Sequence, residues 1–76
     1  MRTTIVEARG RSVSIDIDET SGFHSGEVYF RCTVPMKGRK YQSETTASSQ
    51  LWSENPNLVL DWLADEAVRE AKNYEA

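Results

Sequence analysis

The segment Asn55–Tyr74 decides the predicted fold and reads N-P-N-L-V-L-D-W-L-A-D-E-A-V-R-E-A-K-N-Y. It is the only strong helix signal in the chain, with Asn55 suited to the N-cap and Pro56 to the first helical position. At about 100° per residue, its apolar side chains form one stripe. The stripe consists of Leu60, Leu63, Ala64, Ala67, Ala71 and Tyr74, with Val59 and Val68 at its flanks. We therefore predict a helix over 56–74 that packs this stripe against a sheet.

Four segments before this helix have the character of β-strands. Apolar and polar residues alternate with period two and predict strands at about 3–9, 11–18, 27–34 and 39–46. The segment 19–26 has the composition of a loop, and 47–53 connects the last strand to the helix. The sequence predicts a single α+β domain over 1–76, in which one C-terminal helix packs on a four-stranded antiparallel sheet made of two hairpins.

Two turn signals predict the register of these hairpins. Arg9-Gly10 is expected to close the first hairpin and Lys37-Gly38 the second, because glycine adopts the positive φ that tight turns need. The expected cross-strand neighbours are Val6 with Val13, Tyr41 with Val34, and Arg31 with Glu44. In this register the apolar residues of all four strands share one face, and Pro35 marks the end of the third strand.

Composition limits the classes of function. The chain has 76 residues, one cysteine and a net charge of −3, so an internal disulfide framework and a cysteine-based zinc site are excluded. The N-terminal residues lack an apolar run of the length that a signal peptide or membrane span needs, so we expect a soluble, cytoplasmic protein. The acidic balance argues against direct nucleic-acid binding and favours a protein partner with a basic surface. A homodimer remains open.

The polar side of the predicted helix carries the candidate partner-binding residues. Trp62 stands in the middle of this side, one turn after Leu58. The carboxylates around it are Asp61, Asp65, Glu66 and Glu70. Trp62 either folds over Leu58, is covered by the segment before the helix, or serves as an exposed anchor for a partner, a role in which tryptophan is enriched. The carboxylates would then favour a basic partner.

Catalytic and metal-binding motifs are weak. Asp16-Ile17-Asp18-Glu19-Thr20 matches a D-x-D-x-T phosphotransferase signature, but those enzymes need a doubly wound parallel sheet that a chain of this length cannot form. The same stretch lacks the glycine of a calcium loop, where Ser21 stands instead. We expect His24 to be an exposed loop residue and Cys32 a buried apolar one. We therefore expect no enzyme activity, no metal and no cofactor.

The segment Asp61–Ala71, D-W-L-A-D-E-A-V-R-E-A, resembles the acidic helices of some phage-encoded anti-CRISPR proteins. The resemblance implies a small inhibitor in the host cytoplasm that occupies the surface of a CRISPR–Cas effector. By that analogy, carboxylates would stand in for DNA phosphates; these are Asp61, Asp65, Glu66 and Glu70, with Asp16 and Asp18. Steric blocking through Trp62 or Tyr29 is equally compatible. The alternative is a small protein-interaction or regulatory module of another kind, such as an antitoxin-like or host-takeover protein.

Overall fold

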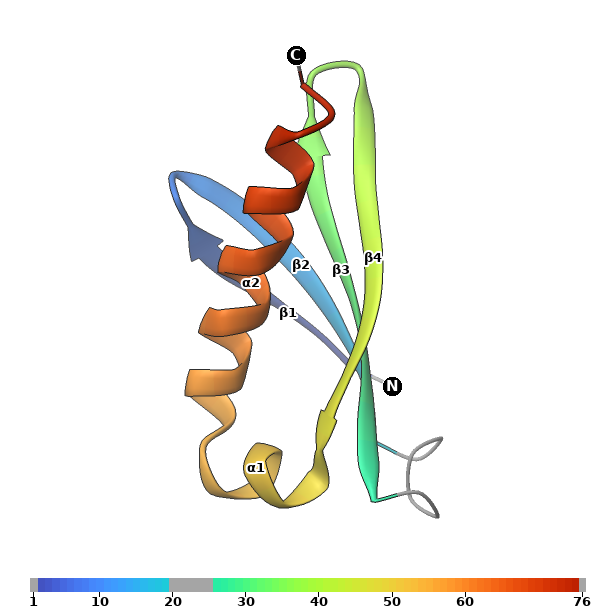
Figure 1. The fold of residues 1–76 in the computed structure, drawn as a ribbon, viewed down its shortest axis with the longest axis vertical. Helices are drawn as coiled ribbons and strands as arrows, with labels where there is room; N and C mark the ends of the chain where they lie inside the picture. The colour runs from blue at the N-terminus through green and yellow to red at the C-terminus, as the bar shows by residue number, and fades with distance from the viewer. Residues whose placement is uncertain (1, 20–25, 76) are drawn as a thin grey trace.

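A computed structural model describes residues 2–19 and 26–75, and it confirms the predicted α+β fold. The elements in chain order are β1 Arg2–Ala8, β2 Arg11–Asp18, β3 Glu27–Met36, β4 Arg39–Ser48, α1 Ser49–Glu54 and α2 Pro56–Lys72. The strands form one antiparallel sheet in the order β1-β2-β3-β4, and α2 lies across one face of it (Figure 1). Of the described residues, no helix is long and apolar enough to cross a membrane.

The sheet has the register that the turn signals predict. Val6 pairs with Val13 across the first hairpin, and Arg31 pairs with Glu44 across the second. Arg9 and Gly10 both have positive φ, 52° and 79°, as a type I′ turn requires. Because side chains alternate along each strand, this register places the apolar residues of β2 and β3 together under α2.

The second hairpin is longer than predicted. Strand β3 continues through Pro35 to Met36, although Pro35 was expected to mark its end. Met36 pairs with Arg39 next to the turn, so Pro35 occupies a position whose nitrogen points away from β4. The pairs between β2 and β3 run only as far as Thr33. Pro35 therefore extends β3 without interrupting either ladder.

The hydrophobic core lies between the sheet and α2. Its buried residues come from β2 and β3 and from the two helices; they are Val13, Ile15, Ile17, Val28, Phe30, Cys32, Val34, Trp52, Val59, Leu63, Ala64, Ala67, Val68 and Ala71. The buried side chains on α2 are mostly small, so the helix axis can approach the strands closely. No buried polar side-chain atom in the described residues lacks a hydrogen-bond partner.

The buried stripe of α2 is rotated from the predicted one. Val59 and Val68 were assigned to the flanks, yet they are 2% and 0% exposed, whereas Leu60 is only half-buried. Tyr74 was placed on the stripe but is 57% exposed, because α2 ends at Lys72 and not at residue 74. Its ring stacks instead on Tyr41, with centroids 5.3 Å apart.

A short helix, α1, lies in the segment that was predicted to connect the last strand to α2. The Ser48 hydroxyl accepts a hydrogen bond from the Leu51 backbone N–H at 3.0 Å and caps this helix. Trp52 lies on its inner side, and its ring meets Phe30 edge to face at 5.3 Å. Asn55 and Pro56 occupy the predicted first positions of α2, but the Asn55 side chain makes no capping hydrogen bond.

Candidate protein-binding surface

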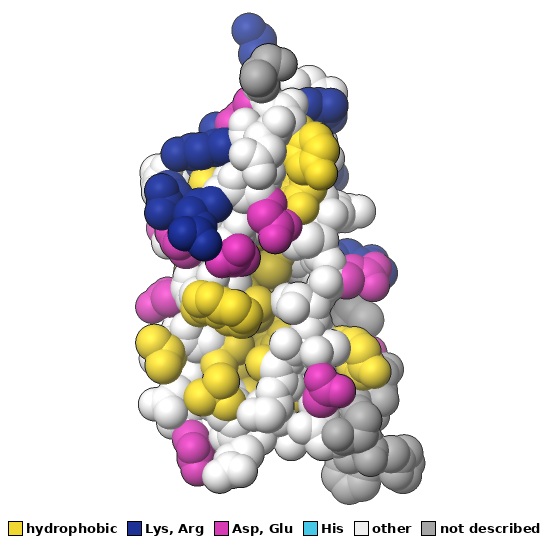
Figure 2. All heavy atoms as spheres, in the orientation of Figure 1, with side chains coloured by type: hydrophobic (Ala, Val, Ile, Leu, Met, Phe, Trp, Pro, Cys, Tyr) yellow, Lys and Arg dark blue, Asp and Glu magenta, His cyan; other side chains and the backbone are white. Residues whose placement is uncertain are grey.

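Trp62 is an exposed side chain on α2. It is 55% exposed, and Leu58 and Leu51 beside it are 63% and 43% exposed. These side chains, with Ala47 and Val59, line one apolar hollow of about 270 Å³. We call Leu51, Leu58 and Trp62 the Trp62 surface. In Figure 2, hydrophobic side chains gather on the lower half of the visible face, over α1 and the first turns of α2.

Trp62 also lines a second, more polar hollow between α2 and β4. This hollow measures about 130 Å³, and its other lining residues are Cys32, Ser43, Glu44, Thr45, Leu63, Glu66, Ala67 and Glu70. Its floor on β4 is formed by small hydroxyl side chains that are half-buried. The indole ring therefore stands between an apolar hollow and one edged by carboxylates. A partner that covers Trp62 would contact both.

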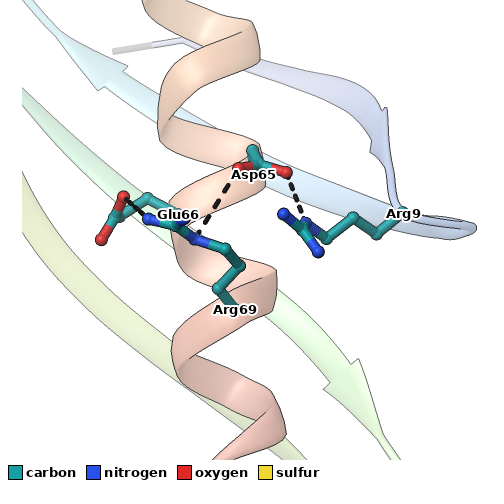
Figure 3. A network of polar contacts seen from close by, with 4 residues as sticks. All are labelled: Arg9, Asp65, Glu66 and Arg69. Carbon is teal, nitrogen blue, oxygen red and sulfur yellow. Dashed lines mark hydrogen bonds and ion pairs between the residues drawn. The ribbon is translucent and has the colours of Figure 1, made fainter.

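Most of the acidic residues near Trp62 already have partners within the chain. Arg9, from the first hairpin turn, donates to Asp65 at 2.6 Å, and Arg69 lies 3.8 Å from the other oxygen of that carboxylate. Arg69 also contacts Glu66 at 2.8 Å, which completes the network in Figure 3. The hydrogen bond from Arg9 lowers the pKa of Asp65. These arginines offset the repulsion expected between like charges one turn apart.

Glu70 accepts a hydrogen bond from a side chain of the sheet. The hydroxyl of Tyr41 on β4 donates a hydrogen bond to it at 2.6 Å. Because the neutral phenol makes this bond and the phenolate could not, the pKa of Tyr41 rises to about 12. Three of the four predicted helix carboxylates therefore have a partner within the chain. Asp61 is exposed and makes no ion pair among the described residues.

The other two predicted partner-binding residues lie elsewhere. Asp16 and Asp18 are on β2, and their side chains alternate with the buried Ile15 and Ile17. They therefore point from the sheet face opposite to α2. There Asp16 accepts a hydrogen bond from Thr3 at 2.6 Å. The seven predicted residues thus divide between two faces, and five of them, all on α2, are near one another.

The structure also places the candidate chemical groups. Asp16 and Asp18 belong to an antiparallel sheet and not to the parallel sheet that the phosphotransferase signature requires. Residues 2–19 and 26–75 contain no group of three His, Cys, Asp or Glu side chains suited to a metal. Cys32 is buried, and loss of solvation raises its pKa to about 11. Thr20, Ser21 and His24 lie outside the described residues.

Leu51 is the part of the surface that sequence reasoning missed. Of Leu51 and Trp52, only Trp52 packs into the core, whereas Leu51 is 43% exposed. The two residues are adjacent in α1, and neighbours in a helix point about 100° apart. Ser48 is the N-cap of α1, and this capping serine is the sequence signal that predicts the helix. The helix in turn places Leu51 and Trp52 on different sides.

Comparison of the chain with protein-family models, with curated proteins and with solved structures finds no significant match.

Proposed function

We propose that this protein is a non-enzymatic inhibitor that binds a partner protein through the Trp62 surface. The observation that carries the proposal is the grouping of Trp62, Leu58 and Leu51, all exposed, around one apolar hollow. Single exposed apolar residues are common on soluble proteins, but a contiguous group with a tryptophan at its centre is typical of a binding site. Burying these side chains would supply the hydrophobic part of the binding free energy.

The charge around this surface favours a partner with basic residues at the edge of the contact. Asp61 is exposed beside Trp62, and Glu54 is exposed at the end of α1. Asp65, Glu66 and Glu70 could bind an incoming cation only by sharing or exchanging their present partners. This arrangement supports an apolar anchor with an acidic rim more strongly than a row of free carboxylates that imitates DNA phosphates.

The most concrete target is a CRISPR–Cas effector, which follows from the resemblance of Asp61–Ala71 to anti-CRISPR helices. In this proposal the Trp62 surface covers a basic Cas surface and blocks it sterically. The alternative is a regulatory module that uses the same surface on a different protein. The pairing of Asp65, Glu66 and Glu70 within the chain favours that alternative over DNA mimicry, because the alternative needs no free carboxylates.

The test is to measure target-DNA binding by a panel of purified CRISPR–Cas effector complexes as this protein is added. Inhibition by the wild-type chain should be lost in Trp62→Ala, by about 30-fold or more in the inhibitory concentration if Trp62 is a hot spot. Tyr29→Ala is the matched control, because Tyr29 is 42% exposed but lies on the other sheet face. If Tyr29→Ala abolished inhibition and Trp62→Ala did not, the assignment of the Trp62 surface as the binding site would be wrong.

The charge contribution has its own pair of variants. Asp61→Asn should weaken inhibition, because this carboxylate is exposed and without an ion pair among the described residues. Asp16→Asn on the other face should have no effect. No inhibition of any effector in the panel would reject the CRISPR target and leave the regulatory alternative, in which Trp62→Ala disrupts a different complex.

A further inference from the structure

Strand β4 is an edge of the sheet, with β3 as its only neighbour in the described chain. Met36 and Arg39 pair beside a two-residue turn, so the odd-numbered residues of β4 direct their backbone groups toward β3. The bond from Ser49 N–H to the Gly26 carbonyl at 2.9 Å continues this pattern. The backbone N–H and C=O groups of Lys40, Gln42 and Glu44 therefore point outward from the sheet. They can accept another strand.

The side chains along this edge are complementary to a second copy of the same strand. Lys40, Gln42 and Glu44 are exposed on the sheet face away from α2. The order is therefore positive, neutral, negative. An antiparallel copy with Gln42 opposite Gln42 reverses this order and sets each Lys40 opposite a Glu44, whose carboxylate would lie between this Lys40 and Arg31 of its own chain, 3.4 Å away. Opposite charges in such directly facing positions stabilise strand pairing, and like charges oppose it.

The other edge of the sheet lacks this property. In β1 the outward backbone groups belong to Thr3, Ile5 and Glu7, since the even-numbered residues bond to β2 next to the first turn. A symmetric pairing about Ile5 would set Thr3 opposite Glu7, which gives no pair of opposite charges. Strand β1 is also shorter, with 7 residues against 10 in β4.

We propose that two copies of this chain pair antiparallel along β4, with Gln42 at the twofold axis, and form a continuous eight-stranded sheet. Three facing residue pairs would supply about six backbone hydrogen bonds. Both α2 helices would lie on the same face of this sheet. The inner side of β4, with Tyr41, Ser43 and Thr45 half-buried, would lie between them. The dimer would present two Trp62 surfaces on one face, but the pairing does not depend on the proposed function.

The first test is the molar mass of the full chain in solution over a range of concentrations, by light scattering and sedimentation. A dimer is expected. Lys40→Glu and Glu44→Lys each set like charges opposite one another at two places, and each should raise the dimer dissociation constant by roughly tenfold or more. The double variant Lys40→Glu/Glu44→Lys restores opposite charges and should restore the dimer. Glu7→Lys, the same charge change on the β1 edge, is the matched control.

The backbone contribution is tested by Gln42→Pro. The Gln42 N–H points away from β3, so proline removes a donor to the second copy and no hydrogen bond within the sheet. Circular dichroism should show that the variant is folded, and light scattering should show that it is a monomer. A wild-type chain that is monomeric at every concentration would overturn the proposal. So would a dimer that survives Gln42→Pro and both single charge changes but is lost in Glu7→Lys or Trp62→Ala.

Discussion

The two halves of α2 differ in what their outward-facing side chains contact. In the first half, Leu58 and Trp62 are exposed, and Asp61 has no ion pair among the described residues. In the second half, Asp65 contacts Arg9 from the first hairpin turn, and Glu70 accepts a hydrogen bond from Tyr41 on β4. Figure 2 shows the same division, with most of the hydrophobic side chains below and most of the charged ones above. We call the part of α2 that contains Asp65 and Glu70 the closed end, because its outward side chains contact other polar groups of the chain. We call the part that contains Leu58 and Trp62 the open end, because these side chains are exposed.

The cause of this difference is the position of the turns. Both hairpin turns and the C-terminus lie at the upper end of the molecule (Figure 1). Arg11 contacts Glu75 there at 2.6 Å, and Arg39 donates to the Tyr74 carbonyl oxygen. At the other end the helix meets Ala47 and the short helix α1, which leave an apolar hollow. The open end is therefore where a partner can remove the most apolar area from water.

The largest predicted effect contrasts the two tryptophans. Trp52 is 7% exposed and packs on Phe30, whereas Trp62 is 55% exposed. Trp52→Ala should lower the free energy of unfolding by about 3–5 kcal/mol, because it leaves a cavity in the core. Trp62→Ala should change it by less than about 1 kcal/mol. Urea unfolding followed by circular dichroism measures both.

Trp52→Phe keeps the experiment usable if the alanine variant does not fold. It should retain part of the edge-to-face contact with Phe30 and lose less stability than Trp52→Ala. Equal losses for Trp52→Ala and Trp62→Ala would show that Trp62 is packed in solution. The difference between the two ends of α2 would then disappear.

The sequence predicted the sheet better than it predicted the surface. Alternation in β2 and β3, with the Arg9-Gly10 and Lys37-Gly38 turns, gave the fold and the register, because burial on one face fixes which residues point inward. The same alternation could not show that Arg9 reaches Asp65, since that contact spans 56 positions and depends on where α2 crosses the sheet. Tyr41 meets Glu70 for the same reason. The partners of these carboxylates can therefore be identified only from the tertiary structure.

A second prediction concerns alkaline pH at the closed end. The hydrogen bond to Glu70 raises the pKa of Tyr41 from 10.0 to about 12. A group with a raised pKa in the folded state contributes stability below its ordinary pKa and loses it as the pH rises. Stability should therefore fall between pH 10 and about 12. Tyr41→Phe should remove this contribution.

The measurement is urea unfolding at several pH values, combined with ultraviolet titration of the phenols. Among residues 2–19 and 26–75, no carboxylate accepts a hydrogen bond from Tyr29 as Glu70 does from Tyr41, so Tyr29→Phe is the control and should keep the alkaline loss of stability. The same pH dependence in wild-type protein and in Tyr41→Phe would show that the contact with Glu70 is absent in solution.

The smallest predicted effect compares two aspartates one turn apart. Asp65 contacts Arg9 and Arg69, so Asp65→Asn should lower the melting temperature at pH 7 by about 1 to 4 °C, as expected for exposed ion pairs. The pKa of Asp65 is lowered, so this stabilisation exists above its ordinary value of 3.8 and is lost as the pH falls below it. Thermal melts of the two proteins should therefore converge in acid.

Asp61→Asn is the matched control at the open end of α2. Because Asp61 has no ion pair among the described residues, its replacement should leave the melting temperature unchanged at both pH values. High salt should reduce the effect of Asp65→Asn by screening its arginines. If Asp61→Asn instead destabilised the chain as much as Asp65→Asn, its carboxylate would have an internal partner. It would then be a poor candidate for binding a basic protein, and the acidic rim would have to be sought elsewhere on the Trp62 surface.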